Sequence, residues 1–290
     1  MGNKKVKVIV DSGCDLPLPL LDSLSVDIIP LNISFGAETF RDYIELTPEI
    51  MLDKLKTLKE NPKTSAPGIS FFKEKYMDYI NQGFDLCVFC LSSVASSTYD
   101  VACMAKKEIE SEQQLDDNSI NIIDTRNFTL AYGLIVRDAA KLALNGVGIS
   151  EVLSFVSEHI DKAKLCFCVS DLSYLRRGGR IKAAEAFIGG MLGIAPVMVI
   201  KDGLVVPVAK ERGMKRAMNR IADVAQSDGC IADGGSMVIM ECGFAEKLDM
   251  FRSVLSERFG GGFEPQTFSL HGTIAAHTGP GAFGIAYYCS

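Results

Sequence analysis

Short apolar runs alternate with stretches of helical periodicity along the first half of this chain, and this alternation limits the fold more than any other feature. Strands are predicted at residues 6–10, 26–35, 84–92 and 119–125. Helices are predicted at residues 47–61, 70–83, 97–111 and 129–146. Strands and helices in this order are typical of a parallel sheet with helices on both faces. The first half therefore predicts an α/β domain.

The regular alternation of strands and helices ends after Gly146. A β-hairpin is predicted over residues 195–209, around the turn Asp202-Gly203. The remaining segments are predicted as helices at 150–163, 183–193, from 214 onward and at 245–260, and as strands at 164–170 and 236–242. Two final strands are also predicted, one of them at 272–276. This mixture favours a second α/β domain with a mixed sheet. We place the two domains at residues 1–155 and 156–290.

Composition argues against several classes of protein. The chain has 30 lysines and arginines against 36 acidic residues, and the net charge of −6 argues against a nucleic-acid-binding protein with a basic face. No run of about 18 apolar residues occurs, so no transmembrane segment is expected. The start of the chain, MGNKKVKVIVDSG, reads as a first strand and not as a signal peptide. We therefore expect a cytoplasmic protein.

Nine cysteines lie scattered through apolar segments, and without an export signal they are expected to be reduced thiols. Cys87 and Cys90 form a C-x-x-C pattern inside a predicted strand, where alternation puts the two side chains on opposite faces. We read them as small buried apolar residues rather than as a redox pair. No second ligand pair accompanies Cys166 and Cys168, so no zinc site is predicted.

Hydroxyl side chains gather in the segment LSSVASSTYD, residues 91–100, directly after an apolar strand. Open α/β sheets bind ligands where strands turn into helix N-termini, and free N–H groups there favour anions. Ser96 is also placed to cap the helix that follows, so a simple cap and an anion site both remain open. Thr64 and Ser65 precede another helix. If the first and third predicted strands are neighbours, Ser12, Thr64 and Ser96 lie together at the rim, the edge of the sheet formed by the carboxyl ends of its strands.

His277 follows a predicted strand at the glycine turn HTGPG, where a ligand could reach it, although an ordinary turn histidine fits the pattern equally. Ser96 and His277, with Asp11 or Asp124 orienting the ring, would make an acyl-transfer enzyme or hydrolase. The chain lacks a G-x-S-x-G elbow, which weakens this alternative. A binder of another small carboxylate or phosphate is a third interpretation.

Eight segments follow one another across nearly the whole chain: VIVDSGCDLP, DIIPLNISFGAETFRD, KTSAPG, LSSVASSTYD, IIDTRN, DLSYLRRGGRI, LGIAPVMVIKDG and AAHTGPGAFGI. Together they resemble the signature blocks of the DegV family of bacterial fatty-acid-binding proteins. No single block would be specific, but their order over the full length is.

The resemblance implies two α/β domains with a long-chain fatty acid, such as palmitate, stearate or oleate, in an apolar tunnel between them. It implies no other cofactor and no metal. Members of this family carry the lipid for a bacterial fatty acid kinase. A separate ATP-binding kinase subunit phosphorylates the carboxylate to an acyl phosphate, so the chain itself is expected to catalyse nothing.

The resemblance also assigns residues. Thr64 and Ser96 should hydrogen-bond the carboxylate, and His277 should lie near the head group. Ser65 and the backbone N–H of Ser97 are secondary candidates, and Ser97 stands where the family usually has glycine. Contacts with the kinase subunit are expected from Arg176, Arg177, Arg180 and Arg212. The tunnel is expected to use Phe35, Phe71, Phe128, Phe187, Ile188, Met191, Leu192 and Ile194.

Overall fold

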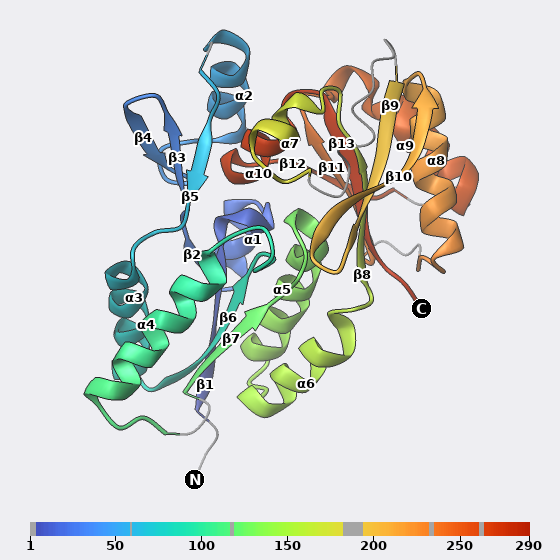
Figure 1. Cartoon of the computed structure of the whole chain (residues 1–290). Helices are drawn as coiled ribbons and strands as arrows, with labels where there is room; N and C mark the ends of the chain where they lie inside the picture. The colour runs from blue at the N-terminus through green and yellow to red at the C-terminus, as the bar shows by residue number, and fades with distance from the viewer. Residues whose placement is uncertain (1–3, 59, 117–118, 182–193, 232–234, 261–263) are drawn as a thin grey trace.

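The computed structural model describes residues 4–58, 60–116, 119–181, 194–231, 235–260 and 264–290. Within these residues the chain forms two larger β-sheets and one small sheet. Figure 1 shows the two larger sheets in two α/β domains, one built from the first half of the chain and the other from the second half.

The first sheet is parallel throughout and has the strand order β2-β1-β6-β7. Its strands are β1 (Lys5–Asp11), β2 (Asp27–Ile29), β6 (Phe84–Cys90) and β7 (Ile120–Asp124). β1 and β6 are neighbours, which is the adjacency that a shared rim requires. The carboxyl ends of these strands lie at the end of the sheet that faces the second domain (Figure 1).

Helices cover both faces of this sheet. α3 (Ile69–Asn81) and α4 (Thr98–Glu112) lie on one face, and α5 (Thr129–Leu144) and α6 (Ile149–His159) lie on the other (Figure 1). Cys90 packs in the same hydrophobic cluster as α3 and α4, whereas Cys87 packs with α5. The two cysteines therefore lie on opposite faces, and the predicted parallel sheet with two helical layers is confirmed.

The second sheet is mixed and has the strand order β10-β9-β8-β13-β11-β12. Its strands are β8 (Ala163–Cys168), β9 (Ile194–Lys201), β10 (Leu204–Arg212), β11 (Met237–Cys242), β12 (Gln266–Ser269) and β13 (Ala282–Tyr288). β11 and β12 are parallel, and the other neighbours are antiparallel. The predicted hairpin of β9 and β10 is confirmed, with Asp202 and Gly203 both at positive φ in its turn.

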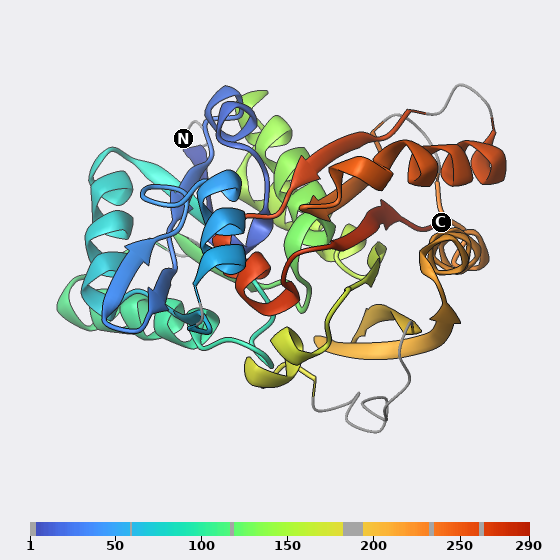
Figure 2. The same ribbon diagram turned by 90° about the horizontal axis from the view of Figure 1, so that it is seen from above.

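The two faces of the second sheet have different neighbours. α8 (Met214–Ser227) and α9 (Leu248–Phe259) cover one face, where they pack on Cys166 and Cys168. Leu165 and Phe167 point to the other face, which belongs to the same hydrophobic core as β1 and α5 of the first domain. Figure 2 shows this sheet between its outer helices and the first domain. The two domains therefore share one core.

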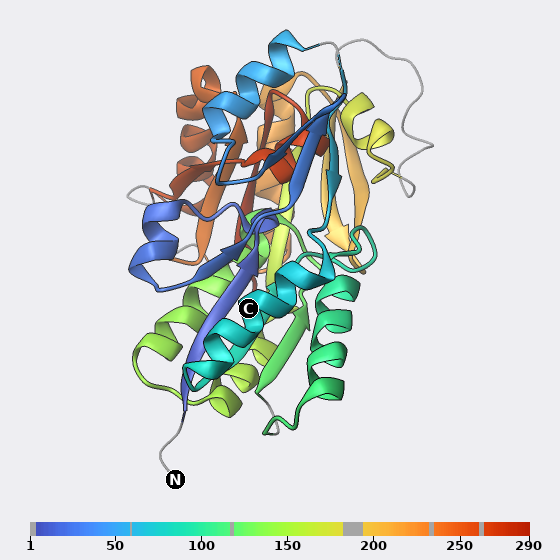
Figure 3. The same ribbon diagram turned by 90° about the vertical axis from the view of Figure 1, so that its left-hand side faces the viewer.

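A small antiparallel sheet of order β4-β3-β5 and helix α2 (Pro48–Thr57) lie above the first sheet and beside the second domain (Figure 3). The strands of the small sheet are β3 (Asn32–Phe35), β4 (Glu38–Arg41) and β5 (Lys63–Ser65). The extended segment predicted at 26–35 is thus two strands in different sheets. The remaining short elements are α1 (Leu18–Ser23), α7 (Ser173–Arg177), α10 (Gly272–Thr278) and the 3-10 turns η1 (Ser12–Cys14) and η3 (Ala245–Lys247).

The strand predicted at residues 272–276 is wrong, because these residues begin α10. The buried carboxylate of Asp42 accepts hydrogen bonds from the backbone N–H groups of Gly272 and Thr273, at 3.0 and 2.8 Å. A cap supplied by a residue so far away in the chain fixes the start of the helix, although the local sequence alternates like a strand.

The passage from one domain to the other falls between α6, which packs on α5, and β8, which begins the second sheet. The exact boundary, placed at residue 155 from the sequence, stays a prediction. The helix predicted at 183–193 lies outside the described residues. Among the helices that the structure describes, none combines the length and apolar character needed to cross a membrane.

Candidate functional site

A cavity of about 610 Å³, including the space at its mouth, lies between the two domains. Most of its wall is apolar. The apolar lining residues are Leu31, Leu91, Ala95, Phe128, Leu165, Phe167, Leu175, Ile200, Val205, Met240 and Ile274. The polar lining residues are Thr64, Ser96, Thr129, Arg180, Thr273, His277 and Thr278. Both domains supply residues of each kind, so the cavity exists only because the domains pack together.

Thr64 and His277 meet in this wall. The Thr64 hydroxyl, on β5, lies 2.8 Å from Nε2 of His277, in the last turn of α10. The other side of the ring faces Gly178, where an added Cβ would lie 2.2 Å from Nδ1. Burial and the nearby Arg180 guanidinium lower the pKa of His277 to about 4. The imidazole is therefore neutral at pH 7 and held in one orientation.

Ser96 has two roles in the structure. Its Oγ accepts a hydrogen bond from the backbone N–H of Thr98, the first residue of α4, at 3.3 Å, and lies 2.9 Å from the Thr98 hydroxyl. Ser96 also lines the cavity. The N-cap position of α4 is Ser97, whose side chain makes no capping hydrogen bond, so Ser96 satisfies the first N–H of the helix from one position earlier. The role of Ser96 as a ligand-binding residue stays a prediction. Ser97 is exposed and does not line the cavity.

Ser65 is exposed, whereas its neighbour Thr64 lines the cavity. Successive side chains of a strand point to opposite faces, and Thr64 lies opposite Ile33 in the small sheet. Ser12 lies behind the cavity wall, because its hydroxyl is 2.9 Å from that of Thr273 and accepts from the backbone N–H of Leu31. The expected rim thus brings Thr64 and Ser96 to the cavity but not Ser12.

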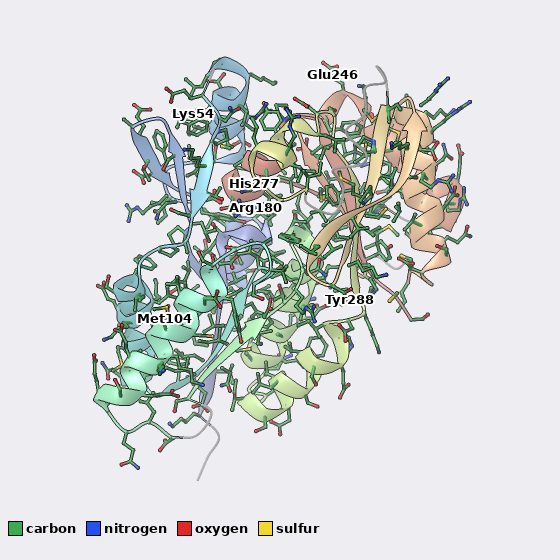
Figure 4. All side chains as sticks on the ribbon, in the orientation of Figure 1. Lys54, Met104, Arg180, Glu246, His277 and Tyr288 are labelled. Atoms are coloured by element: carbon green, nitrogen blue, oxygen red, sulfur yellow. The ribbon has the colours of Figure 1, made fainter. Side chains whose placement is uncertain are left out.

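Arg180 lies in the cavity wall and joins the two domains. Its guanidinium donates to the backbone oxygen of Ala95 from Nε at 3.1 Å and from Nη2 at 2.8 Å, and also donates to the oxygen of Gly178. Burial lowers the pKa of the Arg180 side chain, but an arginine remains charged. Figure 4 labels Arg180 next to His277, between the small sheet and the second sheet.

The other predicted arginines are exposed. Arg176 and Arg177 lie on α7, with the Arg177 guanidinium 4.7 Å from the centre of the Tyr174 ring. Arg212 lies at the end of β10. Their expected contacts with a kinase subunit stay predictions.

Sequence reasoning missed Thr129, Thr273 and Thr278 in the cavity wall. Thr273 and His277 are four residues apart and share one face of α10, so a helical reading of GTIAAHTG would have paired them. Of the predicted tunnel residues, Phe128 lines the cavity. Phe35 packs instead against Phe40. Phe71 packs against the hydrophobic cluster formed with α3 and α4. Ile194 begins β9 outside the lining, and Phe187, Ile188, Met191 and Leu192 lie outside the described residues.

The arrangement does not support a serine–histidine relay. His277 Nε2 is bonded to Thr64, and Ser96 to Thr98. Asp11 accepts from the Tyr132 hydroxyl and from two backbone N–H groups, and Asp124 accepts from Ser93. Neither carboxylate bonds the imidazole within the described residues, and no group of His, Cys, Asp and Glu there is arranged to hold a metal ion.

A two-domain α/β protein with a mainly apolar interdomain cavity and a cluster of hydroxyl, imidazole and guanidinium groups in its wall has the character of a carrier for an amphipathic ligand. A family model described as "Uncharacterised protein, DegV family" matches residues 5–290. The chain therefore belongs to the DegV family, as its sequence blocks indicated.

Known proteins are similar to this chain over nearly its full length. A protein of Thermotoga maritima named fatty acid-binding protein is 30% identical to this chain over 296 residues, which cover 97% of this chain and 96% of the relative. A fatty-acid-binding DegV family structure from Thermus thermophilus is 27% identical with a TM-score of 0.86, covering 99% of this chain and all of that chain. DegV of Bacillus subtilis, described as a fatty acid binding protein, is 27% identical with a TM-score of 0.83 over 99% of this chain and 100% of that chain.

Proposed function

We propose that this chain binds a long-chain fatty acid in the interdomain cavity, with the tail along the apolar wall and the carboxyl group at Thr64, Ser96 and His277. The observation that carries the proposal is the combination of this wall with the polar cluster in one cavity. Burial of about 14 methylenes contributes on the order of 11 kcal/mol before entropic costs, so the tail supplies most of the affinity.

The head group needs donors, because an ionised carboxylate is costly to bury unpaired. A neutral His277 with its proton on Nε2 donates to the Thr64 oxygen and leaves the Thr64 hydroxyl hydrogen for the ligand. The Ser96 hydroxyl is the second donor. The charge of Arg180, which lines the same cavity, favours the ionised form of the fatty acid.

We further propose that the bound carboxyl group is presented to a separate ATP-binding kinase subunit. There the carboxylate oxygen attacks the γ-phosphorus of ATP, ADP leaves, and an acyl phosphate forms. The exposed cations Arg176, Arg177 and Arg212 are the proposed contacts for that subunit.

Mass spectrometry of the purified, denatured protein tests lipid binding first. The extract should contain a long-chain fatty acid, and palmitate or oleate added to delipidated protein at 100 times its Kd should raise Tm by about 5 °C. Thr64→Val and Ser96→Ala should each weaken binding about 10-fold through a lost hydrogen bond. Ser65→Ala, at the exposed neighbour, is the matched control and should bind normally. A lipid-free extract together with an unchanged Tm contradicts the proposal.

The kinase step has its own test. The lipid-loaded chain, ATP and a bacterial ATP-binding fatty acid kinase subunit should yield acyl phosphate, trapped with hydroxylamine as the hydroxamate. The double variant Arg176→Glu, Arg177→Glu should keep its lipid but lose most of this product. If the chain with ATP alone yields acyl phosphate, the carrier role is wrong and lipid binding still stands.

A further inference from the structure

Two cysteines face each other near the C-terminus of the second domain. Cys230 follows α8, Cys289 follows β13, and the two form an isolated antiparallel bridge. Their backbone N–H groups do not bond to each other. The Cys230 N–H donates to the backbone oxygen of Ala225 at 3.0 Å, and the Cys289 N–H donates to that of Lys162 at 2.9 Å.

The backbone bonds on either side define the type of pair. The N–H of Ile231 donates to the oxygen of Tyr288 at 2.9 Å, and the N–H of Ser290 donates to the oxygen of Gly229 at 3.1 Å. Bonds that flank a pair in this way make it a non-hydrogen-bonded pair, in which opposite Cα atoms approach to about 4.5 Å. Disulfides need Cα atoms about 4.4 to 6.8 Å apart, so the backbone already meets that requirement.

Both side chains project from the same face of the ladder. Cys230 packs against the hydrophobic cluster beneath α8 and α9, which contains Tyr287. Cys289 is two residues beyond Tyr287 and therefore shares its face, whereas Tyr288 belongs to the opposite core. Cys230 and Cys289 are each partly exposed, so a small oxidant can reach them.

The remaining cysteines differ from this pair. Six of the nine are buried, and only Cys103, on α4, shares the partial exposure of the pair. Burial raises the pKa of Cys168 and Cys242 to about 12, which leaves little reactive thiolate. In the strand registers of the described residues, no other two cysteines lie opposite each other.

We propose that Cys230 and Cys289 form a reversible disulfide when the protein meets a peroxide. One thiolate attacks a peroxide oxygen, the O–O bond breaks, and a sulfenic acid and hydroxide form. The second thiolate attacks the sulfenic sulfur and displaces a second hydroxide. Two thiols and one hydrogen peroxide thus give one disulfide and two waters, and a dithiol reductant reverses the change.

The bridge would close a ring that contains β11, α9, β12, α10 and β13. A cross-link over about 60 residues restricts the unfolded chain far more than the folded one, where the two cysteines already meet. Oxidation should therefore raise Tm, on the order of 5 °C, and the reductant should restore the original value.

Peptide mapping tests the proposal directly. The purified chain is treated with hydrogen peroxide, its remaining thiols are alkylated, and it is cut with trypsin and with a protease that cleaves before aspartate. These cuts separate Cys230, in peptide 228–232, from Cys242, and leave Cys289 as the sole cysteine of peptide 259–290. A disulfide between these two peptides is the expected result.

Variants supply the controls. Cys230→Ser and Cys289→Ser should each abolish both the bridged peptide and the rise in Tm, whereas Cys103→Ser should keep both. If a serine variant fails to fold, the peptide map of the wild-type protein still tests the proposal. Bridges between other cysteines, cross-linked dimers, or sulfinic acid at Cys230 without a bridged peptide would each overturn the proposal.

Discussion

The His277 ring is held from both sides, which makes Gly178 a sensitive position. The backbone of Gly178 has φ −70, a conformation that alanine adopts freely, yet an added Cβ would lie 2.2 Å from Nδ1 of His277. We expect Gly178→Ala to displace the ring from Thr64 and to weaken palmitate binding at least 10-fold, since overpacking costs about 1–3 kcal/mol. Titration calorimetry measures the change. Gly68→Ala, at φ −70 and with an added Cβ only in ordinary van der Waals contact at 3.8 Å from Oγ of Ser70, should bind normally.

The buried imidazole also affects stability at acidic pH. The pKa of His277 falls to about 4 in the folded protein, below its ordinary value of 6.5. In the unfolded chain His277 is therefore protonated below pH 6.5, whereas in the folded chain it is protonated only below about pH 4. The free energy of unfolding therefore decreases as pH falls from 6.5 to about 4. His277→Gln should remove this loss, which amounts to about 3 kcal/mol at most. Urea unfolding at pH 7 and pH 4.5 tests it, and parallel pH dependences for the two proteins would contradict the prediction.

Single residues show how far sequence reasoning reaches. The signature blocks point to Thr64, Ser96 and His277, and the structure brings all three to one cavity, while their contact with a carboxylate stays a prediction. Adjacent hydroxyls do not reveal which one points inward, because strand register decides that. Ser97, the serine expected to stand in place of a family glycine, is exposed.

Arg180 illustrates a different limit. In the sequence it is one of three cations around a glycine turn, a pattern that predicts a contact with the partner subunit. In the structure Gly179 adopts φ +73, the chain reverses, and Arg180 points back to the first domain at Ala95. A pattern of charges cannot show that reversal.

Among the elements, α10 depends on the first domain for its start. Asp42 accepts from Gly272 N–H, from Thr273 N–H and from the Thr273 hydroxyl at 2.5 Å, and Asp15 accepts from His271 N–H at 2.7 Å. Burial raises the pKa of Asp42 to about 6, so it is largely ionised at pH 7. A negative charge at a helix N-terminus is favourable, and here it fixes the helix that carries His277.

Removal of this cap should damage stability and the site together. Asp42→Ala leaves buried donors without acceptors, which costs about 3 kcal/mol, and it should lower Tm and the fraction of protein that retains lipid. Asp42→Asn keeps one acceptor, so its Tm should lie between those of the wild type and Asp42→Ala. Asp53→Ala, at an exposed position on α2, is the matched control and should match the wild type. A normal Tm for Asp42→Ala would show that α10 is held by other contacts.

For the whole molecule, the sequence predicted two α/β domains, but not which face of the second sheet meets the first domain. From Leu165 to Cys168, β8 is apolar on both faces, with Leu165 and Phe167 on one and Cys166 and Cys168 on the other. Such a strand has no alternation of apolar and polar residues to mark an outer face. The interdomain cavity therefore becomes visible only in the folded chain.

A ligand in this cavity must contact both domains, and Met240 tests that. Met240, on β11 of the second sheet, lines the cavity, and the proposed head-group residues Thr64 and Ser96 belong to the first domain. Met240→Gln keeps the shape but places an amide against the fatty acid tail, at a cost of about 1–3 kcal/mol, so palmitate should bind about 10-fold more weakly. Met240→Leu should bind nearly as the wild type does. Calorimetry of the three proteins decides: equal affinity for the glutamine variant would mean that the tail does not run along the second sheet.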